Sequence, residues 1–325
     1  MSQMMLAGVA SPDGLTLQQV PVPQPDSGQI LVKVYAAGLN RADLNAAKGA
    51  GVATAGSHGK PIGMEWSGEI VALGAGTTGF AVGDRVACSG TGGYAEFAVT
   101  PATRAIRLSG AMDLEQAAVL PLALMTADNA LRALGSMSEG DAVLVHGGSS
   151  AVGQAAIQIA RLLGAGHITA TARNAEKRDR LAAMGADLVL DPANGWTDAI
   201  RSATGGKGAN VIIDMITGPQ LRETMMAAAV LGRVVNVGRL GGLNAEIDLD
   251  LHSRDRISLI GATFRTRSIA EISVIVAAVQ ADIWPLVEQG RLALPIDRSF
   301  RLADAVEAQS WMAADRHFGK ILLRP

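Results

Sequence analysis

Small residues with the spacing of a phosphate-binding turn stand near the middle of the chain. Residues 143–153 read Val-Leu-Val-His-Gly-Gly-Ser-Ser-Ala-Val-Gly, so an apolar run passes through glycines and serines into an apolar pattern with helical spacing. Such a turn lets backbone N–H groups approach a pyrophosphate at a helix N-terminus, where the helix dipole favours negative charge. A plain strand–helix turn would look similar. A second predicted strand begins about 15 residues after Gly153, and this context favours dinucleotide binding.

The end of that second strand distinguishes between the two nicotinamide cofactors. A site specific for NAD usually places Asp or Glu there to bind the ribose 2′-hydroxyl, whereas a site for NADP offers cations. Here the strand end carries Arg173, Asn174 and Lys177 and no acid before Glu176. Arg173 and Lys177 can pair with a 2′-phosphate and Asn174 can donate to it, although a solvated basic helix start would look the same. The pattern favours NADPH over NADH.

Other kinds of chemistry find little support in the sequence. Cys88 is the only cysteine, so neither an intramolecular disulfide nor a multi-cysteine metal site can form. His146, beside the glycine turn, is expected to be buried and hydrogen-bonded, and the other histidines lack metal-type spacing. Ser149 and Ser150 lie in the phosphate turn, which gives no hydrolase motif.

Alternating strands and helices must position the turn. Residues 1–110 are expected to be β-rich, with strands at 30–36 and 69–73 and a turn entering a strand at 83–87. From about residue 117 the pattern becomes α/β, typical of a parallel sheet with right-handed crossovers. The expected strands are 142–146, 168–172, 188–190, 211–215, 233–237 and 258–264, and the expected helices 151–163, 175–184, 220–231 and 270–289. The β-rich tail, ending at 319–323, is expected to return to the first domain.

Composition excludes several classes of protein. The 325 residues are 49% hydrophobic and 18% charged, typical of a globular chain long enough for two domains. A formal net charge of -2 gives no electrostatic reason to bind nucleic acid or an anionic membrane. No apolar run approaches 18 residues and no signal peptide is visible, so a cytoplasmic protein with no membrane partner is expected.

Short motifs in a fixed order are spread over nearly the whole chain. They are Gly38-Leu-Asn-Arg-Ala-Asp43, Gly63-Met-Glu-Trp-Ser-Gly-Glu69, Val82-Gly-Asp-Arg-Val86, Gly92-Gly-Tyr-Ala-Glu-Phe97, Ala117-Ala-Val-Leu-Pro121 with Thr126-Ala127, the glycine turn, Gly232-Arg-Val-Val-Asn-Val-Gly238 and Phe318-Gly-Lys-Ile321. Together they resemble the zinc-independent quinone oxidoreductases of the medium-chain dehydrogenase/reductase superfamily. The resemblance implies an α/β protein with a GroES-like β-rich catalytic domain (1–122 and 267–325) and a doubly wound Rossmann NADPH-binding domain (123–266). It also implies a homodimer.

Zinc-dependent alcohol dehydrogenases are similar, and ligand chemistry separates them. Laid against their pattern, the three catalytic ligand positions become Asn40, Met64 and Leu122, with Glu65 beside the missing histidine. None of the three is a plausible zinc ligand, so no metal is expected. Without a Lewis acid, hydride transfer needs an acceptor that delocalises charge, such as a quinone or a conjugated alkene. An enone, enal or enoyl-thioester reductase, and an NADPH-binding protein without turnover, remain alternatives.

The resemblance also places the site residues. Asn40 is the candidate that faces the nicotinamide and donates to a substrate carbonyl, although it could instead be a turn residue bonded to local backbone. Tyr94 is a candidate proton donor or pocket residue, with packing as the alternative, and Arg41 and Asp43 are expected to form a structural pair. Substrate choice is expected to depend on residues 45–60, 240–255 and 265–270. The residues expected to line the cofactor channel are Asn40, Thr126, Ser149, Ser150, Ala151, Val152, Gly153, Arg173, Asn174, Lys177, Ile216, Thr217, Val237, Gly238, Arg239, Thr263, Phe264, Arg265 and Lys320, the last two as cations for phosphate.

Overall fold

The chain divides into two compact units. The computed structural model describes residues 3–48, 59–193 and 195–325. Unit 1 comprises Met1–Ala123 and Phe264–Pro325, and unit 2 comprises Leu124–Thr263. The C-terminal boundary of unit 2 lies after Thr263, three residues before the expected boundary between residues 266 and 267. Phe264 and Arg265 therefore belong to unit 1 rather than to the expected cofactor-binding unit. Residues 49–58, most of the expected 45–60 substrate loop, lie outside the described residues.

Unit 1 is β-rich and is built from both ends of the chain. Its larger sheet has the strand order β14-β15-β3-β4-β5-β7, with β6 pairing β3, and a separate hairpin joins β1 to β2. The C-terminal strand β15 runs antiparallel to β3, with Leu322 opposite Gly38, as expected for the tail. The strands are β1 (Met4–Ser11), β2 (Gly14–Pro21), β3 (Gln29–Gly38), β4 (Glu65–Leu73), β5 (Arg85–Ser89), β6 (Phe97–Pro101), β7 (Ala105–Arg107), β14 (Ile296–Arg301) and β15 (Lys320–Arg324).

The helices of unit 1 are short except for one. Helix α9 (Ile269–Ala278) passes through the π-helical turn Val279–Ile283 into α10 (Trp284–Glu288), which agrees with the expected helix at 270–289. By length and composition alone this stretch, Ile269–Glu288, is apolar enough to cross a membrane, a test that the core helix of a soluble protein also passes. Here Ser273 on α9 donates to Thr103 of the same unit. The others are α1 (Arg41–Ala47), α2 (Leu114–Ala118), α11 (Ala305–Ala313) and α3 (Pro121–Asp128), which crosses the boundary between the units.

Unit 2 is a six-stranded parallel sheet with the order β10-β9-β8-β11-β12-β13. The chain starts in the centre at β8, moves outward to β10, then returns to β11 and moves outward on the other side. A sheet of this order binds ligands at the carboxyl ends of its strands, where the order reverses beside β8. The strands are β8 (Ala142–His146), β9 (His167–Thr171), β10 (Leu188–Leu190), β11 (Ala209–Asp214), β12 (Ala228–Asn236) and β13 (Ser258–Gly261).

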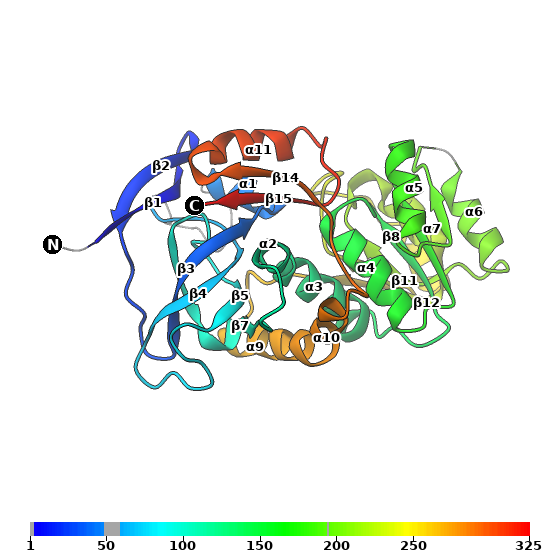
Figure 1. Ribbon diagram of the computed structural model, residues 1–325. Helices are drawn as coiled ribbons and strands as arrows, with labels where there is room; N and C mark the ends of the chain where they lie inside the picture. The colour runs from blue at the N-terminus through cyan, green and yellow to red at the C-terminus, as the bar shows by residue number, and fades with distance from the viewer. Residues whose placement is uncertain (1–2, 49–58, 194) are drawn as a thin grey trace. The chain divides into compact units, whose positions relative to one another are not determined.

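Helices cover both faces of this sheet, and Figure 1 shows α4 and α6 on opposite sides of the strands. Alternate strand residues such as Leu144, Ile212 and Val234 form one core cluster with Trp196 and Met225 from the helices. The helices are α4 (Ala151–Leu162), α5 (Ala175–Ala183), α6 (Trp196–Ala203), α7 (Leu221–Ala227) and α8 (Leu249–Arg254).

Several expectations for unit 2 need correction. The helix expected at 220–231 ends at Ala227, because Ala228 already pairs with Ala209 in the sheet and strand pairing overrides the helix propensity of the alanines. The strand expected at 258–264 ends at Gly261, and helices α6 and α8 were not expected. The amphipathic face of α6 buries Trp196 and Ile200 over only eight residues, too short a pattern to distinguish from a loop.

Candidate functional site

The glycine turn of unit 2 has the geometry of a phosphate cradle. Ser150 caps α4, since its Oγ accepts from Gly153 N at 3.0 Å, and helix geometry leaves the N–H groups of Ala151 and Val152 without an intrahelical acceptor. Gly147 has a φ of +85°, in the left-handed region that favours glycine. A Cβ on Gly153 would lie 2.7 Å from Gly148 Cα. The backbones of Gly148 and Gly153 therefore lie so close together that a side chain at residue 153 would not fit between them. Such close approach is expected for a dinucleotide site.

The end of β9 presents the expected basic group. Arg173 and Asn174 are exposed, and Lys177 is half-buried in the first turn of α5. The Asn174 side chain caps this helix by accepting from Lys177 N at 3.0 Å, so its oxygen is occupied and its amide nitrogen is the atom left for a phosphate. Sequence reasoning missed Arg178, whose guanidinium donates to Ala172 O and Arg173 O at 2.9 Å and thereby holds the turn in place.

The loops after β11 and β12 are tied together through buried Asp214. Its carboxylate accepts from Ile216 N, Thr217 N and Thr217 Oγ1 at 2.8–3.2 Å. Thr217 has a φ of +53°, which is uncommon outside glycine, and its hydroxyl also bonds Gly238 O at 3.1 Å. Non-glycine residues held in this way cluster at functional sites. The sequence did not single out Asp214, although an acid closing an apolar strand is a signal for such a role.

His146 is a buried structural residue, as expected. Its ring nitrogens lie 2.8 Å from Thr171 Oγ1 and from Gln220 Oε1, and the ring stacks on Trp196 at a centroid distance of 4.9 Å. Burial lowers the pKa of His146, which favours the neutral ring. Thr171 Oγ1 in turn accepts from Gly147 N at 2.9 Å. Through Thr171, His146 therefore helps to fix the position of Gly147, the first residue of the turn.

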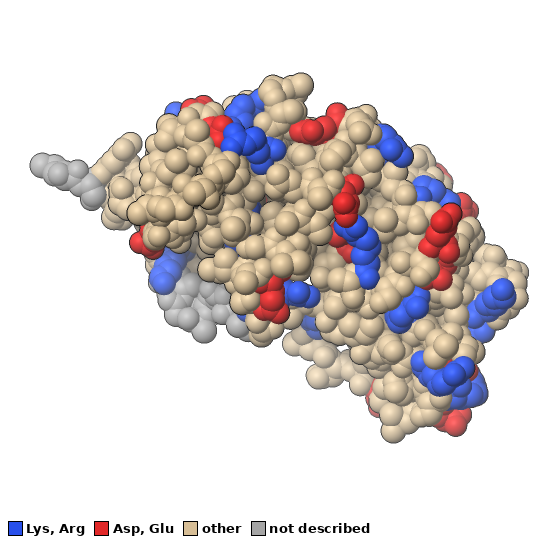
Figure 2. Space-filling model, turned by 90° about the horizontal axis from the view of Figure 1, so that it is seen from below, with Lys and Arg blue, Asp and Glu red and all other residues tan. Residues whose placement is uncertain are grey.

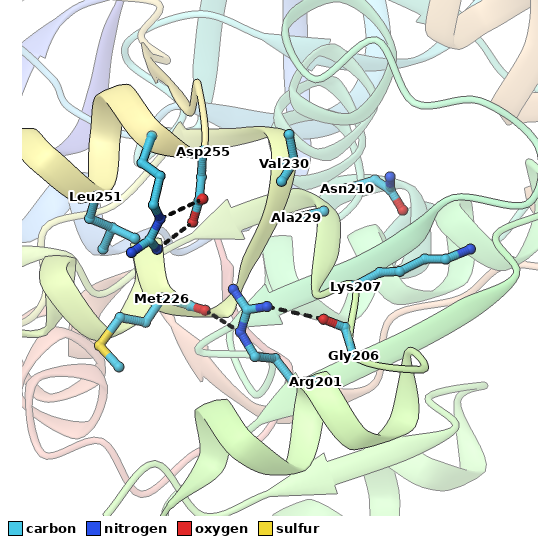
Figure 3. A pocket seen from close by; sticks show the side chains of 10 residues that line it. Arg201, Gly206, Lys207, Asn210, Met226, Ala229, Val230, Leu251 and Asp255 are labelled. Carbon is cyan, nitrogen blue, oxygen red and sulfur yellow. Dashed lines mark hydrogen bonds and ion pairs between the residues drawn. The ribbon is translucent and has the colours of Figure 1, made fainter.

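A separate hollow of about 560 Å³ opens in unit 2 at the amino ends of β11 and β12 (Figure 3). This is the edge of the sheet opposite to the glycine turn. Arg201 in it donates to Met226 O and Gly206 O, and Arg254 pairs with Asp255. The hollow is therefore not the predicted cofactor site, and most of its positive charge is already engaged.

In unit 1, a buried lysine lies at the centre of a second polar cluster. Lys320 Nζ donates to Leu39 O and Asn40 Oδ1 at 2.8 Å and to Glu65 Oε1 at 2.5 Å. Its side chain is 2% exposed and that of Glu65 is fully buried. The expectation that Lys320 is a surface cation for the cofactor phosphate is wrong, because all three of its donors are used inside unit 1.

Asn40 is held within the same cluster. Its Nδ2 donates to Glu65 Oε1 at 3.0 Å and to Gly38 O at the long distance of 3.4 Å, while its Oδ1 accepts from Lys320. The residue is half-buried at the start of α1. Glu65 Oε2 accepts from Leu122 N at 2.8 Å and closes the cluster. Two of the three positions that correspond to zinc ligands are thus bonded to Glu65.

Asp43 and Tyr94 form a pair of their own. Tyr94 is fully buried and its hydroxyl donates to Asp43 Oδ2 at 2.8 Å, while burial and the carboxylate raise the pKa of Tyr94 well above its usual value. A buried phenol that is already donating cannot reach a substrate, so the proposed proton donor is corrected to a core residue. The expected pairing of Arg41 with Asp43 is also wrong, because Arg41 pairs with Asp315 on the surface.

The residues of unit 1 do not fit a zinc ion. An amide, a thioether and an aliphatic side chain stand at the three ligand positions, and zinc binds thiolate, imidazole or carboxylate. Over residues 3–48, 59–193 and 195–325, no three His, Cys, Asp or Glu side chains gather as a metal site. The carboxylate of Glu65 bonds two of the three ligand positions, and Lys320 already pairs with it.

Most of the predicted cofactor residues come together on one edge of one sheet. Ser149–Gly153, Arg173–Asn174, Ile216–Thr217, Val237–Arg239 and Thr263 all follow carboxyl ends of the parallel strands of unit 2. Thr126 belongs to the same unit, on α3. Asn40, Phe264, Arg265 and Lys320 belong to unit 1. Sequence reasoning also undervalued Glu65, which opens β4 and is fully buried, because a buried carboxylate needs a buried partner.

Comparison with known proteins agrees with this architecture. Residues 26–110 match the alcohol dehydrogenase GroES-like domain, and residues 151–280 match the family model described as zinc-binding dehydrogenase. The chain is 32% identical to the quinone oxidoreductase of Rattus norvegicus, over 96% of this chain and 94% of that protein. It is also 32% identical to a mycocerosic acid synthase-like polyketide synthase of Mycobacterium tuberculosis, but spans only 14% of that protein.

Solved structures agree as well. A mycobacterial quinone oxidoreductase superposes with a TM-score of 0.85 at 28% identity, covering 99% of this chain and 100% of that one. A mycobacterial protein solved with NADPH superposes with a TM-score of 0.84 at 27% identity, covering 99% and 100%. The chain is an NAD(P)-dependent oxidoreductase that belongs to the quinone oxidoreductase-like family of the medium-chain dehydrogenase/reductase superfamily.

Proposed function

We propose that this oxidoreductase uses NADPH and transfers hydride, without zinc, to a quinone or another activated alkene. The observation that carries the proposal is the donor set of unit 1. Asn40, Met64 and Leu122 stand where zinc ligands would be, and a buried ion pair of Lys320 and Glu65 lies among them. An acceptor that delocalises the incoming charge needs less Lewis-acid assistance than an alcohol or a simple aldehyde does.

Unit 2 supplies the features that support NADPH. When bound, the reduced nicotinamide supplies the hydride. The amides of Ala151 and Val152 would hold the pyrophosphate, and the close approach of Gly153 to Gly148 leaves that surface free of side chains. Arg173 and Lys177 would hold the 2′-phosphate at the end of β9, where an NAD site carries an acid.

Asn40 is proposed to contact the acceptor. Its Nδ2 has one short hydrogen bond, to Glu65, and one long bond, to Gly38 O, so the second hydrogen can be given to a substrate carbonyl oxygen. A donor aimed at an oxygen that gains charge stabilises the transition state more than the ground state.

Oxidation of NADPH against quinones, conjugated enones, a short enoyl thioester and simple aldehydes tests the proposal. We expect turnover of quinones or conjugated alkenes and little turnover of aldehydes. A preference for enoyl thioesters would favour the second candidate, a double-bond reductase, which the similarity to part of a polyketide synthase supports. Turnover of aldehydes alone would contradict the proposal.

The remaining parts of the proposal concern partners and location. Strand β13 is the last strand in its sheet, and pairing of two such edges would form a homodimer, which sedimentation tests as twice 33.4 kDa. On the face shown in Figure 2, basic and acidic side chains are interspersed, which gives no support for a nucleic-acid surface. A cytoplasmic location is proposed because Cys88 is a buried free thiol, and cell fractionation tests it.

A further inference from the structure

The buried cation of unit 1 is linked to two of the three positions that correspond to zinc ligands in the zinc-dependent relatives. Lys320 Nζ bonds Asn40, at one zinc-type position, and Glu65, whose other oxygen bonds the backbone of Leu122, at another. These acceptors are a carbonyl, an amide oxygen and a carboxylate. They are a poor set for zinc and a good set for an ammonium, which has three donors and requires three acceptors.

Lysine also decides which way the Asn40 amide is turned. An ammonium only donates, so the atom of Asn40 that faces Nζ at 2.8 Å must be the oxygen. The nitrogen then lies on the side of Glu65 and Gly38. If the amide were flipped, its oxygen would meet the carboxylate of Glu65, and the side chain would offer no hydrogen to an acceptor oxygen.

We propose that Lys320 is a positioning residue whose ammonium replaces the metal cation of the zinc-dependent relatives, neutralising Glu65 and fixing the Asn40 amide as a hydrogen-bond donor. This inference rests on the proposed function in so far as it assigns the donor to the acceptor's carbonyl oxygen. Lys320 acts through Asn40 and Glu65 and does not touch the substrate, because its three donors are engaged within the cluster.

The test compares four variants with wild type: Lys320→Met, Glu65→Gln, the double variant, and Arg324→Met as the matched control. Methionine matches the length of lysine without its charge. Arg324 lies on the same strand and pairs with Glu115, but its side chain is 52% exposed, so its loss leaves the cluster intact. The measurements are the melting temperature, kcat and KM for the best acceptor, and Kd for NADPH.

We expect Lys320→Met to melt several degrees lower and to lose kcat on the order of tenfold to a hundredfold, with Kd for NADPH and KM little changed. In the double variant both buried charges are gone, so we expect the melting temperature to recover most of the way to the wild-type value while kcat stays low. Arg324→Met behaves as wild type. If the double variant recovers kcat along with its stability, the lysine is only a structural counter-ion and the inference fails.

A second readout does not depend on turnover. The side-chain amide of Asn40 is observed by ¹⁵N NMR in NADPH-bound protein. Its hydrogen exchange is expected to be slow in wild type and in Glu65→Gln and fast in the double variant, which differs from Glu65→Gln only at residue 320. Equal exchange in Glu65→Gln and the double variant contradicts the positioning role. If wild type reduces no acceptor in the panel, the proposed function fails, and this spectrum still decides whether Lys320 fixes Asn40.

Discussion

The hydroxyl of Tyr94 donates to the carboxylate of Asp43 at 2.8 Å, and both side chains are buried in the core of unit 1. Asn40 N donates to the same oxygen, whereas Asp43 Oδ1 has no hydrogen-bond partner among the described residues. Burial raises the pKa of Asp43 from 3.8 to about 7, against the lowering effects of Tyr94, Asn40 and Lys320. The core of the β-rich unit therefore contains an acid that is half protonated near neutral pH.

This pair predicts a pH dependence of stability. The folded pKa of Asp43 lies above its unfolded value, so the folded state binds the extra proton and is most stable below pH 3.8 as far as this group is concerned. The contribution is lost as pH rises from 3.8 to about 7, in total about 4 kcal/mol. Asp43→Asn keeps an oxygen for Tyr94 and Asn40 and removes the proton. Melting temperatures from pH 5 to 8 should fall less steeply in the variant, and parallel slopes would refute the assignment.

Arg173→Ala is expected to weaken NADPH and leave NADH nearly unchanged. Loss of a charged hydrogen bond to the 2′-phosphate costs about 2 kcal/mol, or roughly thirtyfold in Kd. Arg180→Ala is the control, since Arg180 is an exposed arginine further along α5. Fluorescence titration with both cofactors measures the effect. Equal weakening of NADH and NADPH binding would contradict the proposal that Arg173 binds the 2′-phosphate.

Gly153→Ala is expected to damage the phosphate turn. The added Cβ would lie 2.7 Å from Gly148 Cα and from Gly148 O, and backbone cannot yield as a side chain would. Overpacking of this kind costs about 1–3 kcal/mol and displaces the amides of the turn. Gly110→Ala provides the control, because a Cβ at Gly110 meets nothing within 4 Å. Calorimetric titration with NADPH should show weaker binding for Gly153→Ala only, and unchanged affinity would mean that the turn is not the pyrophosphate site.

Thr217→Val is expected to loosen the loops after β11 and β12. Valine keeps the shape of threonine but loses the hydroxyl that joins Asp214, Asn236 and Gly238. Leaving such buried groups unpaired costs about 1–3 kcal/mol. Hydrogen exchange should rise at residues 216–218 and 236–241 while the core strands stay protected, with a higher KM for NADPH. Unchanged exchange in these loops would show that the hydroxyl does not hold them.

Local signals were enough to predict the strands, turn and helix at the proposed cofactor edge. Strand β8, the glycine turn and helix α4 are each predicted from sequence patterns that span no more than about twenty consecutive residues. The same holds for the basic residues that follow β9. The polar cluster of unit 1 could not be predicted in this way. Glu65 and Lys320 lie 255 residues apart and meet only because β15 returns beside β3 and β4 follows on its other side. Sequence pattern indicated that the tail returns, but not which buried charges it would bring together.

The most direct test of the zinc-free account is activity after complete metal removal. Protein treated with a strong chelator and freed of it is assayed for NADPH-dependent quinone reduction, and its zinc content is measured, with and without added zinc. We expect a zinc content far below one ion per chain and a kcat that neither treatment changes, because Lys320 supplies the cation beside Asn40 and Glu65. Activity that disappears with the chelator and returns with zinc would contradict it.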